Sequence, residues 1–140
     1  MKFSTRVLYG CRAMVDLARR GREGTLPLRA LAEGQHMPER YLSKIIQDLR
    51  RSGLIRSVRG AHGGYVLSRP ADEITLLDVW EALEGPIRPV DCLDTPDACN
   101  MMAECLTRDV WDKLRGAFVE VLASETIGGL VRRRRRKARR

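Results

Sequence analysis

Long apolar runs, enzyme motifs and internal repeats are all missing from this chain of 140 residues. No apolar run approaches the ~20 residues that a membrane-spanning helix needs. Arg6 and Arg12 interrupt the stretch where a signal peptide would be apolar. The chain also lacks a nucleophile–base pair, a paired-acid motif and a glycine-rich phosphate loop between a strand and a helix. We therefore expect a cytoplasmic protein that has no membrane span and is not an enzyme.

Acidic residues are scarce in the first half of the chain, and basic residues are scarce in the second half. Residues 1–69 carry 14 basic and 5 acidic side chains, whereas residues 70–131 carry 4 basic and 13 acidic ones. A basic first half indicates that this half faces a polyanion. The alternative is that these charged side chains are simply exposed to solvent and that their uneven distribution has no functional meaning.

A run of basic residues without a single acid, RRRRRKARR, occupies positions 132–140. It cannot bury enough apolar surface to fold, so we expect a disordered tail. Such a tail could add DNA affinity that is sensitive to salt and independent of sequence. It could equally be a solvated end with no specific role.

A polar-faced helix followed by a hairpin forms the centre of the sequence, between residues 38 and 67. Pro38 suits the first turn of a helix, and Ser52-Gly53 is a stop signal. Two short apolar runs joined by a glycine-rich turn then predict a β-hairpin. Apolar residues recur along the helix at three- and four-residue spacing and share one face, namely Tyr41, Leu42, Ile45, Ile46 and Leu49. This pattern is typical of a recognition helix and its wing.

The polar face of this helix and the tip of the hairpin carry the residues that we predict to contact DNA. Gln47 can pair with adenine, and Lys44 can donate to guanine, in the major groove. Arg59, beside Gly60, is placed for the minor groove, where narrow A·T-rich segments attract arginine. The full predicted set is Arg40, Tyr41, Ser43, Lys44, Gln47, Arg59 and Gly60.

Apolar periodicity predicts further helices on both sides of this centre. Residues 4–20 and 28–33 precede it, and Gly34 is expected to end the second of these helices. Together with the recognition helix they make a helix-turn-helix bundle. Thr75 can cap a helix over residues 76–85. The predicted fold is mainly α with a small β-hairpin, in which a winged helix-turn-helix head precedes a long dimerisation helix.

The dimerisation helix is expected over residues 106–127, with Gly128-Gly129 ending it. Its apolar seam consists of Val110, Trp111, Leu114, Phe118, Val121 and Leu122. We favour pairing of this seam with a second copy of the chain, because winged-helix proteins usually bind two half-sites. Packing of the helix on its own domain is the alternative.

Three of the four cysteines lie in a stretch without sustained periodicity, residues 87–105, which predicts a loop of ~19 residues. Cys92, Cys99 and Cys105 are separated by six and then five residues, so they can converge on one metal centre. Thiolates are soft ligands that suit iron–sulfur clusters, zinc or copper(I). The spacing is not the C-x-x-C of zinc ribbons. The alternative is three cytosolic thiols, which could be redox-reactive.

A cluster normally needs a fourth ligand, and the loop holds no histidine. The candidates are a group from a partner subunit, Cys11 of the first helix, or the loop acids Asp91, Asp94, Asp97 and Glu104. For Cys11 we favour a different interpretation, a small apolar core residue of its helix.

Three stretches of the sequence resemble the IscR/NsrR/CymR type of bacterial winged-helix regulators, the Rrf-type family. They are MKFSTRVLYGCRAMVDLA at the start, RYLSKIIQDLRRSGLIRSVRGAHGGYVLSRP in the middle and EITLLDVWEALEGPIRPVDC before the loop. The resemblance implies a homodimer with crossed long helices and two DNA-binding heads. It also implies a [2Fe–2S] or [4Fe–4S] cluster on Cys92, Cys99 and Cys105, which would sense iron, cluster supply, nitric oxide or redox state.

The sequence departs from this family in three places. One cluster-binding branch has a histidine shortly after the third cysteine, where this chain has Leu106-Thr107-Arg108. Another branch uses a carboxylate from the first helix of the partner subunit, where this chain has Leu8. A third departure is Ser43, because one branch has an acid there that would accept from a cytosine amino group.

We therefore expect a transcription regulator, a repressor or dual regulator, that binds a double-stranded DNA operator and is switched by an iron–sulfur cluster. Residues 1–70 would form the DNA-binding region, residues 71–131 the helix, cysteine loop and dimerisation helix, and residues 132–140 the disordered tail. The alternatives are the same regulator with its cysteines acting as a thiol redox or zinc sensor, and an adaptor that controls a partner enzyme.

Overall fold

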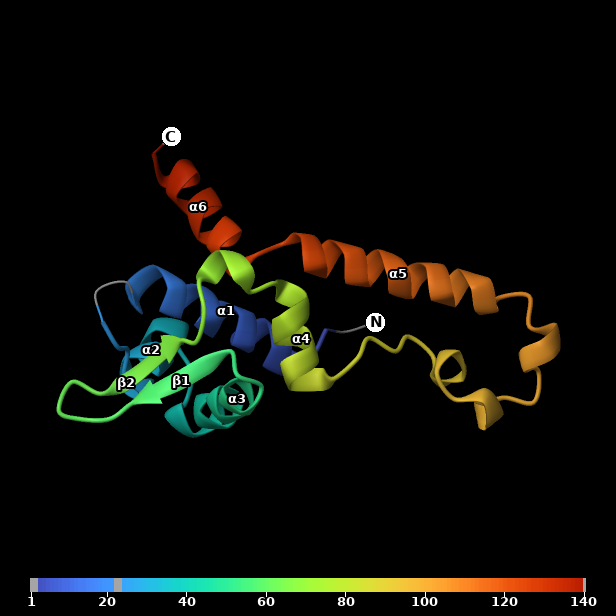
Figure 1. Cartoon of the computed structure of the whole chain (residues 1–140), viewed down its shortest axis with the longest axis horizontal. Coiled ribbons are helices and arrows are strands. Elements are labelled where there is room, and N and C mark those ends of the chain that lie inside the picture. The colour runs from blue at the N-terminus through green and yellow to red at the C-terminus, as the bar shows by residue number, and fades with distance from the viewer. Residues whose placement is uncertain (1–2, 22–23, 140) are drawn as a thin grey trace.

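The computed structural model describes residues 3–21 and 24–139 (Figure 1). Its helices and strands are α1 (Thr5–Arg20), α2 (Leu28–Gln35), α3 (Glu39–Arg51), β1 (Ile55–Val58), β2 (Gly64–Leu67), α4 (Leu76–Glu84), α5 (Arg108–Ser124) and α6 (Ile127–Ala138). Short 3-10 turns are η2 (Ala71–Glu73), η3 (Asp91–Leu93), η4 (Pro96–Ala98) and η5 (Met102–Glu104). Within the described ranges, no helix combines the length and the apolar character that crossing a bilayer requires.

The helix-turn-helix bundle forms because α1, α2 and α3 each bury one apolar face in a shared core. α3 contributes Leu42, Ile45, Ile46 and Leu49, all at most 1% exposed. They pack with side chains from α1 and α2 that include Met14, Leu17 and Leu31. The predicted inner face of α3 is therefore confirmed, with the exception of Tyr41, which is 38% exposed.

The turn between α2 and α3 differs from the expectation that Gly34 ends the second helix. The helix continues through Gly34 to Gln35. His36 then adopts a left-handed conformation with φ 53°, and its backbone N–H donates to the carbonyls of Ala32 and Glu33. A left-handed residue that closes the last turn in this way is the usual helix C-terminal signal. Here a histidine takes the position that glycine commonly fills.

The predicted wing is present as an antiparallel hairpin. Ile55 pairs with Leu67 at its base and Val58 pairs with Gly64 near its tip. Leu26, before α2, adds an isolated bridge to β2, because its N–H and C=O both bond to the backbone of Tyr65. This bridge joins the wing to the bundle.

α4 begins where the sequence predicted. Thr75 accepts a hydrogen bond from the Asp78 backbone N–H at 3.0 Å, and the Asp78 carboxylate accepts one from the Thr75 N–H at 2.8 Å. This reciprocal pair is a capping box. α4 packs closely against α1, since a Cβ on Gly10 would lie 2.4 Å from Leu83 Cδ1.

The long helix predicted over residues 106–127 is shorter and ends at Ser124. Glu125 and Thr126 are extended because they pair with the strand-like segment before α4. The Leu76 N–H donates to the Glu125 carbonyl at 2.8 Å, and the Ile127 N–H donates to the Ile74 carbonyl at 2.9 Å. Gly128 and Gly129 therefore do not end α5; they lie in the first turn of α6.

The basic tail also differs from the expectation of disorder, because residues up to Ala138 belong to α6. The Thr126 hydroxyl caps this helix by accepting from the Gly129 N–H at 3.0 Å. Ile127 and Val131 are buried at its base. Once these residues have formed the first turn, arginine extends the helix readily because it has a high helix propensity. The basic composition of the tail gave no indication of this capped and buried first turn, which initiates the helix.

Candidate nucleic-acid interface and cysteine loop

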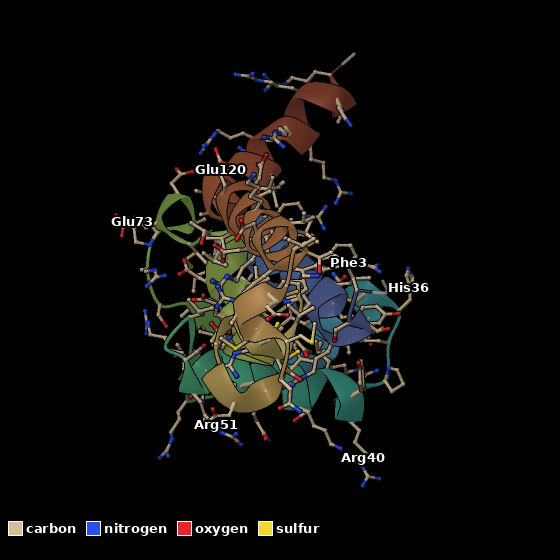
Figure 2. The ribbon with its side chains drawn as sticks, turned by 90° about the vertical axis from the view of Figure 1, so that its right-hand side faces the viewer. Phe3, His36, Arg40, Arg51, Glu73 and Glu120 are labelled. Carbon is tan, nitrogen blue, oxygen red and sulfur yellow. The ribbon has the colours of Figure 1, made fainter. Side chains whose placement is uncertain are left out.

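The outer face of α3 presents polar side chains to solvent at one end of the molecule. Arg40, Lys44 and Gln47 are exposed, and Ser43 is half-buried. Figure 2 shows Arg40 and Arg51 pointing outward from this end. Four buried apolar side chains hold the opposite face of the helix in the core, so these polar groups occupy fixed positions. The major groove of DNA is wide enough to admit an exposed helix of this kind.

Tyr41 belongs to an aromatic and cationic cluster that the sequence interpretation did not identify. Its ring meets the ring of Tyr9 edge to face, with the centroids 6.1 Å apart. The guanidinium of Arg12 lies 5.4 Å from the Tyr9 centroid, a cation–π distance. Tyr9 and Arg12 are three residues apart on α1, and this spacing could have indicated that they share a face. The cluster places Arg12 in the same surface region as α3.

A partly buried ion pair holds α3 against its neighbours. Arg6 of α1 pairs with Asp48 of α3 and donates to the Leu83 carbonyl of α4 at 2.8 Å. Asp48 also pairs with Arg51 at 3.1 Å. Arg6 thus connects three helices, and it partly neutralises Asp48 on the recognition helix.

The tip of the wing is exposed at Arg59 and Gly60. The Gly63 N–H donates to the Gly60 carbonyl at 2.9 Å, which closes the turn. The Thr25 hydroxyl donates to the His62 carbonyl, so a residue before α2 holds the returning strand. These bonds fix the wing beside the bundle with Arg59 free to extend beyond its tip.

The three loop cysteines lie on separate short turns. Cys92 is within η3, Cys99 follows η4, and Cys105 follows η5. All are free thiols; Cys99 is exposed, and the other two are half-buried. In the ranges 3–21 and 24–139, no group of three or more His, Cys, Asp or Glu side chains is gathered closely enough to hold a metal ion. The donor chemistry fits an iron–sulfur cluster, but the sulfur atoms are spread along the loop.

Ion pairs attach the loop to its surroundings at Asp94. This carboxylate pairs with Arg88 at 3.2 Å and with Arg115 of α5 at 2.7 Å. Arg115 also pairs with Asp112 at 2.6 Å. As a candidate fourth ligand, Asp94 is already engaged by two guanidinium groups. It instead links the loop to the first half of α5.

Cys105 has an environment that favours the thiolate more than the environment of Cys11 does. Its sulfur lies 3.4 Å from the Thr107 hydroxyl. That hydrogen bond, with backbone donors nearby, lowers the pKa of the Cys105 thiol. A lower thiol pKa favours both metal binding and oxidation.

Cys11 has the opposite environment. Burial raises the pKa of Cys11 to about 11. The thiol borders a cavity of about 490 Å³ whose described lining comes from α1, the end of α2 with His36, α4 and α6 rather than from the cysteine loop. Cys11 also packs against the hydrophobic core, which matches the apolar interpretation of this residue and places it apart from the loop of its own chain.

The apolar seam predicted on α5 is divided between two faces. Phe118 is half-buried and its ring centroid lies 5.9 Å from that of Phe3. Val110, Leu114 and Val121 remain 57%, 37% and 61% exposed. α5 contributes no buried residue. The stripe of Val110, Leu114 and Val121 is therefore left uncovered by residues 3–21 and 24–139.

Known proteins resemble this chain over almost its whole length. The model of the Rrf2 family, described as an iron-dependent transcriptional regulator, matches residues 3–133. The HTH-type transcriptional regulator CymR of Bacillus subtilis (strain 168) is 39% identical over 130 residues, which cover 93% of this chain and 89% of CymR.

Solved structures show the same arrangement. IscR of T. potens superposes with a TM-score of 0.78 at 36% identity, covering 94% of this chain and 87% of IscR. The oxidised form of Staphylococcus aureus CymR superposes with a TM-score of 0.74 at 36% identity, covering 94% of this chain and 96% of that one. The predicted winged helix-turn-helix fold is confirmed. By sequence and by structure, the chain belongs to the Rrf2 family of transcriptional regulators.

Proposed function

We propose that this regulator changes its operator affinity when an iron–sulfur cluster binds to Cys92, Cys99 and Cys105. The observation that carries the proposal is the position of these thiols in the loop that joins α4 to α5. Asp94 and Arg115 connect the loop to α5, so ordering the loop would also position that helix. The family is one of DNA-binding transcription regulators and not of enzymes.

The DNA-binding region in this proposal is residues 1–70. Arg40, Lys44 and Gln47 would face the major groove, and Arg59 with Gly60 would reach the minor groove. Tyr41 and Ser43 would lie at the edges of this surface. The exposure of the polar face of α3 supports this assignment.

Residues 71–131 would sense the signal and form the homodimer. The exposed stripe of Val110, Leu114 and Val121 supports pairing of α5 with a second copy, because apolar surface of this extent on a helix gains from being covered. A dimer would present two heads to two half-sites of an operator. The chromosome as target implies a cytoplasmic site of action.

The switch follows from the two states of the loop. When bound, the cluster would supply metal–thiolate bonds that hold the three turns of the loop together. The Asp94–Arg115 pair would transmit the ordered loop to α5, and α5 would set the spacing of the two heads. A ligand shifts such an equilibrium only by its different affinity for the two states, so DNA and cluster must affect each other's binding.

The test is iron and acid-labile sulfide per chain, with an absorption spectrum, on protein purified without oxygen. Stoichiometric iron and sulfide that are lost in C99A but kept in C11A would support the proposal. Colourless wild-type protein that resists reconstitution of the cluster would overturn it. C11A is the matched control, because it removes a thiol outside the loop.

A second candidate is a thiol redox sensor that uses the same loop. It is favoured by Cys105, whose lowered thiol pKa promotes oxidation. The related CymR of Staphylococcus aureus has been solved in an oxidised form. Mass spectrometry of cluster-free protein after peroxide treatment distinguishes the two candidates. A sulfenic acid or disulfide at Cys105, together with altered DNA affinity, would favour the thiol redox sensor.

A further inference from the structure

We propose that α6 is a second DNA-binding element, which contacts a duplex other than the one bound by α3 and the wing. The juxtaposition that carries this inference is a basic helix fixed firmly at its base and directed away from the recognition surface. The inference rests on the family's DNA binding, and it does not depend on the iron–sulfur cluster.

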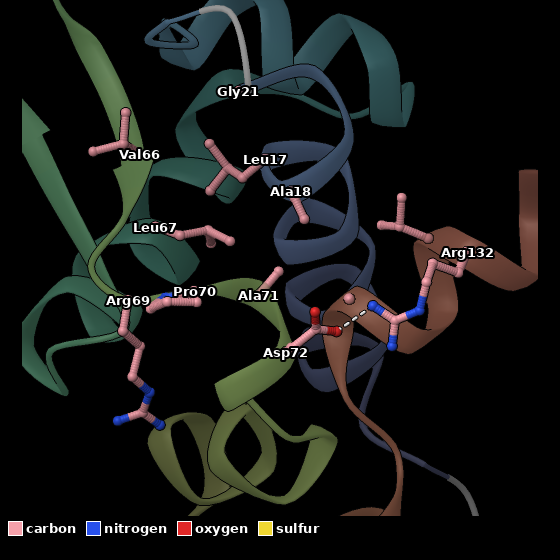
Figure 3. Close-up of a pocket in the computed structure, with 12 residues that line it drawn as sticks. Leu17, Ala18, Gly21, Val66, Leu67, Arg69, Pro70, Ala71, Asp72 and Arg132 are labelled. Carbon is pink, nitrogen blue, oxygen red and sulfur yellow. Dashed lines mark hydrogen bonds and ion pairs between the residues drawn. The ribbon is translucent and has the colours of Figure 1, made fainter.

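The base of α6 is anchored so closely that its direction is determined. A Cβ on Gly128 would lie 2.1 Å from Asp72 Oδ1 and 3.0 Å from the Asp72 backbone nitrogen. Arg132 pairs with the same Asp72 carboxylate, as Figure 3 shows beside the cavity between α1, β2 and η2. Ile127 and Val131 are buried against the core. The helix therefore leaves the body along one defined path.

Beyond this base, α6 is almost entirely cationic. Six consecutive basic residues occupy positions 132–137 and, at 3.6 residues per turn, they cover every side of the helix. Arg132 and Arg133 pair with Asp72 and Glu125. No further ion pair of α6 occurs within the part of the chain that the structure describes. Like charges four residues apart repel each other, so a polyanion would stabilise this helix.

The location of α6 decides which polyanion it can reach. In Figure 1, α6 rises from the side of the molecule opposite α3 and the hairpin. Figure 2, turned by 90°, again places α6 at the far end from Arg40 and Arg51. A straight duplex bound to α3 and the wing would leave the outer turns of α6 on the other side of the protein. A second duplex near the operator is the polyanion that α6 can meet there, and an arginine helix suits its phosphates.

The experiment measures single-duplex binding and duplex bridging separately. Two 30-bp duplexes of mixed sequence carry donor and acceptor fluorophores, and energy transfer between them reports bridging by full-length protein. The α6 variant is R134Q/R135Q/R136Q, because glutamine keeps helix propensity while removing charge. The head variant is K44Q/R59Q. The control is R88Q/K113Q, which removes two exposed charges, as many as the head variant does, at positions outside both surfaces.

We expect the wild type and R88Q/K113Q to bridge duplexes in a salt-sensitive manner. The α6 variant and the head variant should each lose bridging at least tenfold while still binding a single duplex through the remaining surface. Continued bridging by the α6 variant would overturn the proposal, since two heads of a dimer would then be sufficient. Association of protein beyond a dimer without DNA, lost in the α6 variant, would assign α6 to the acidic half of another copy instead. Wild type that binds no duplex at any salt concentration would refute DNA binding itself.

Discussion

The head and the segment formed by the cysteine loop and α5 differ in how much of their surface one chain can cover. α1, α2 and α3 bury complete apolar faces. α5 buries no residue and leaves an apolar stripe exposed. The cysteine loop likewise offers three thiols that are not gathered into a site. The difference teaches that the head covers its apolar faces within one chain, whereas the second half leaves apolar surface and thiols exposed, as our proposal of a cluster and a second copy requires.

The largest expected effect comes from truncating equivalent leucines in the two regions. Leu42→Ala removes a fully buried side chain of α3 and should lower the free energy of unfolding by about 2–5 kcal/mol. Leu114→Ala on α5 should change the unfolding of the monomer by less than ~1 kcal/mol. Urea denaturation at low protein concentration measures both values. Equal losses would mean that α5 is as well packed as the head.

Cys11 and Cys105 should differ strongly in their reactivity toward alkylating reagents. A pKa raised from 9.0 to about 11 lowers the thiolate fraction of Cys11 roughly a hundredfold at pH 8. The pKa of Cys105 is shifted downward, so its alkylation should rise at a lower pH than that of an ordinary thiol. Iodoacetamide labelling of apo protein, followed by peptide mass spectrometry between pH 6 and 10, measures both. Equal rates at the two positions would remove this distinction.

Adding one methyl group to a glycine should also separate the two regions. Gly10→Ala places a Cβ 2.4 Å from Leu83 Cδ1, and overpacking of this kind costs about 1–3 kcal/mol of stability. Gly116→Ala on α5 places its Cβ more than 4 Å from any atom outside the adjoining backbone of that helix and should stabilise the helix by up to ~1 kcal/mol. Thermal unfolding followed by circular dichroism gives the sign of each change. A stabilising Gly10→Ala would contradict the close packing of α1 on α4.

The smallest effect is expected on assembly. Val121→Glu places a charge on the exposed stripe of α5 and should raise the dissociation constant of a dimer at least tenfold, about 1.4 kcal/mol. The unfolding of the isolated chain should change little, because Val121 is already 61% exposed. Sedimentation velocity over a range of concentrations measures the shift. Glu120→Gln, at an exposed neighbouring position, is the control that should leave assembly unchanged.

Periodicity was sufficient to predict the head. The helices, the hairpin and the capping residue Thr75 were all placed within a few residues, because local apolar spacing and turn signals determine them. The misplaced ends have a common cause. His36 closes α2 by backbone hydrogen bonds, and Thr126 breaks the long helix by pairing with Thr75, so neither end depends on the glycines that marked it in the sequence.

The candidate sites were predictable in kind but not in arrangement. Residue type indicated a polar recognition face and a thiol-rich loop. It could not indicate that Arg12 and Tyr9 join the surface around Tyr41, because the cluster combines two helices. It also could not show that Asp94 is engaged by Arg88 and Arg115. Such contacts depend on tertiary packing, which a single sequence does not contain.

The absence of a side chain at Gly10 has a mechanical consequence. Where Leu83 meets the backbone of α1 directly, no flexible group separates the two helices, and packed interiors yield little to compression. A displacement of α4 therefore moves α1 with it. Arg6 leaves from the same helix and holds both Asp48 and the Leu83 carbonyl. A movement of the end of α4 would consequently displace the recognition helix α3 as a rigid body and would not be absorbed by rearrangement of the core.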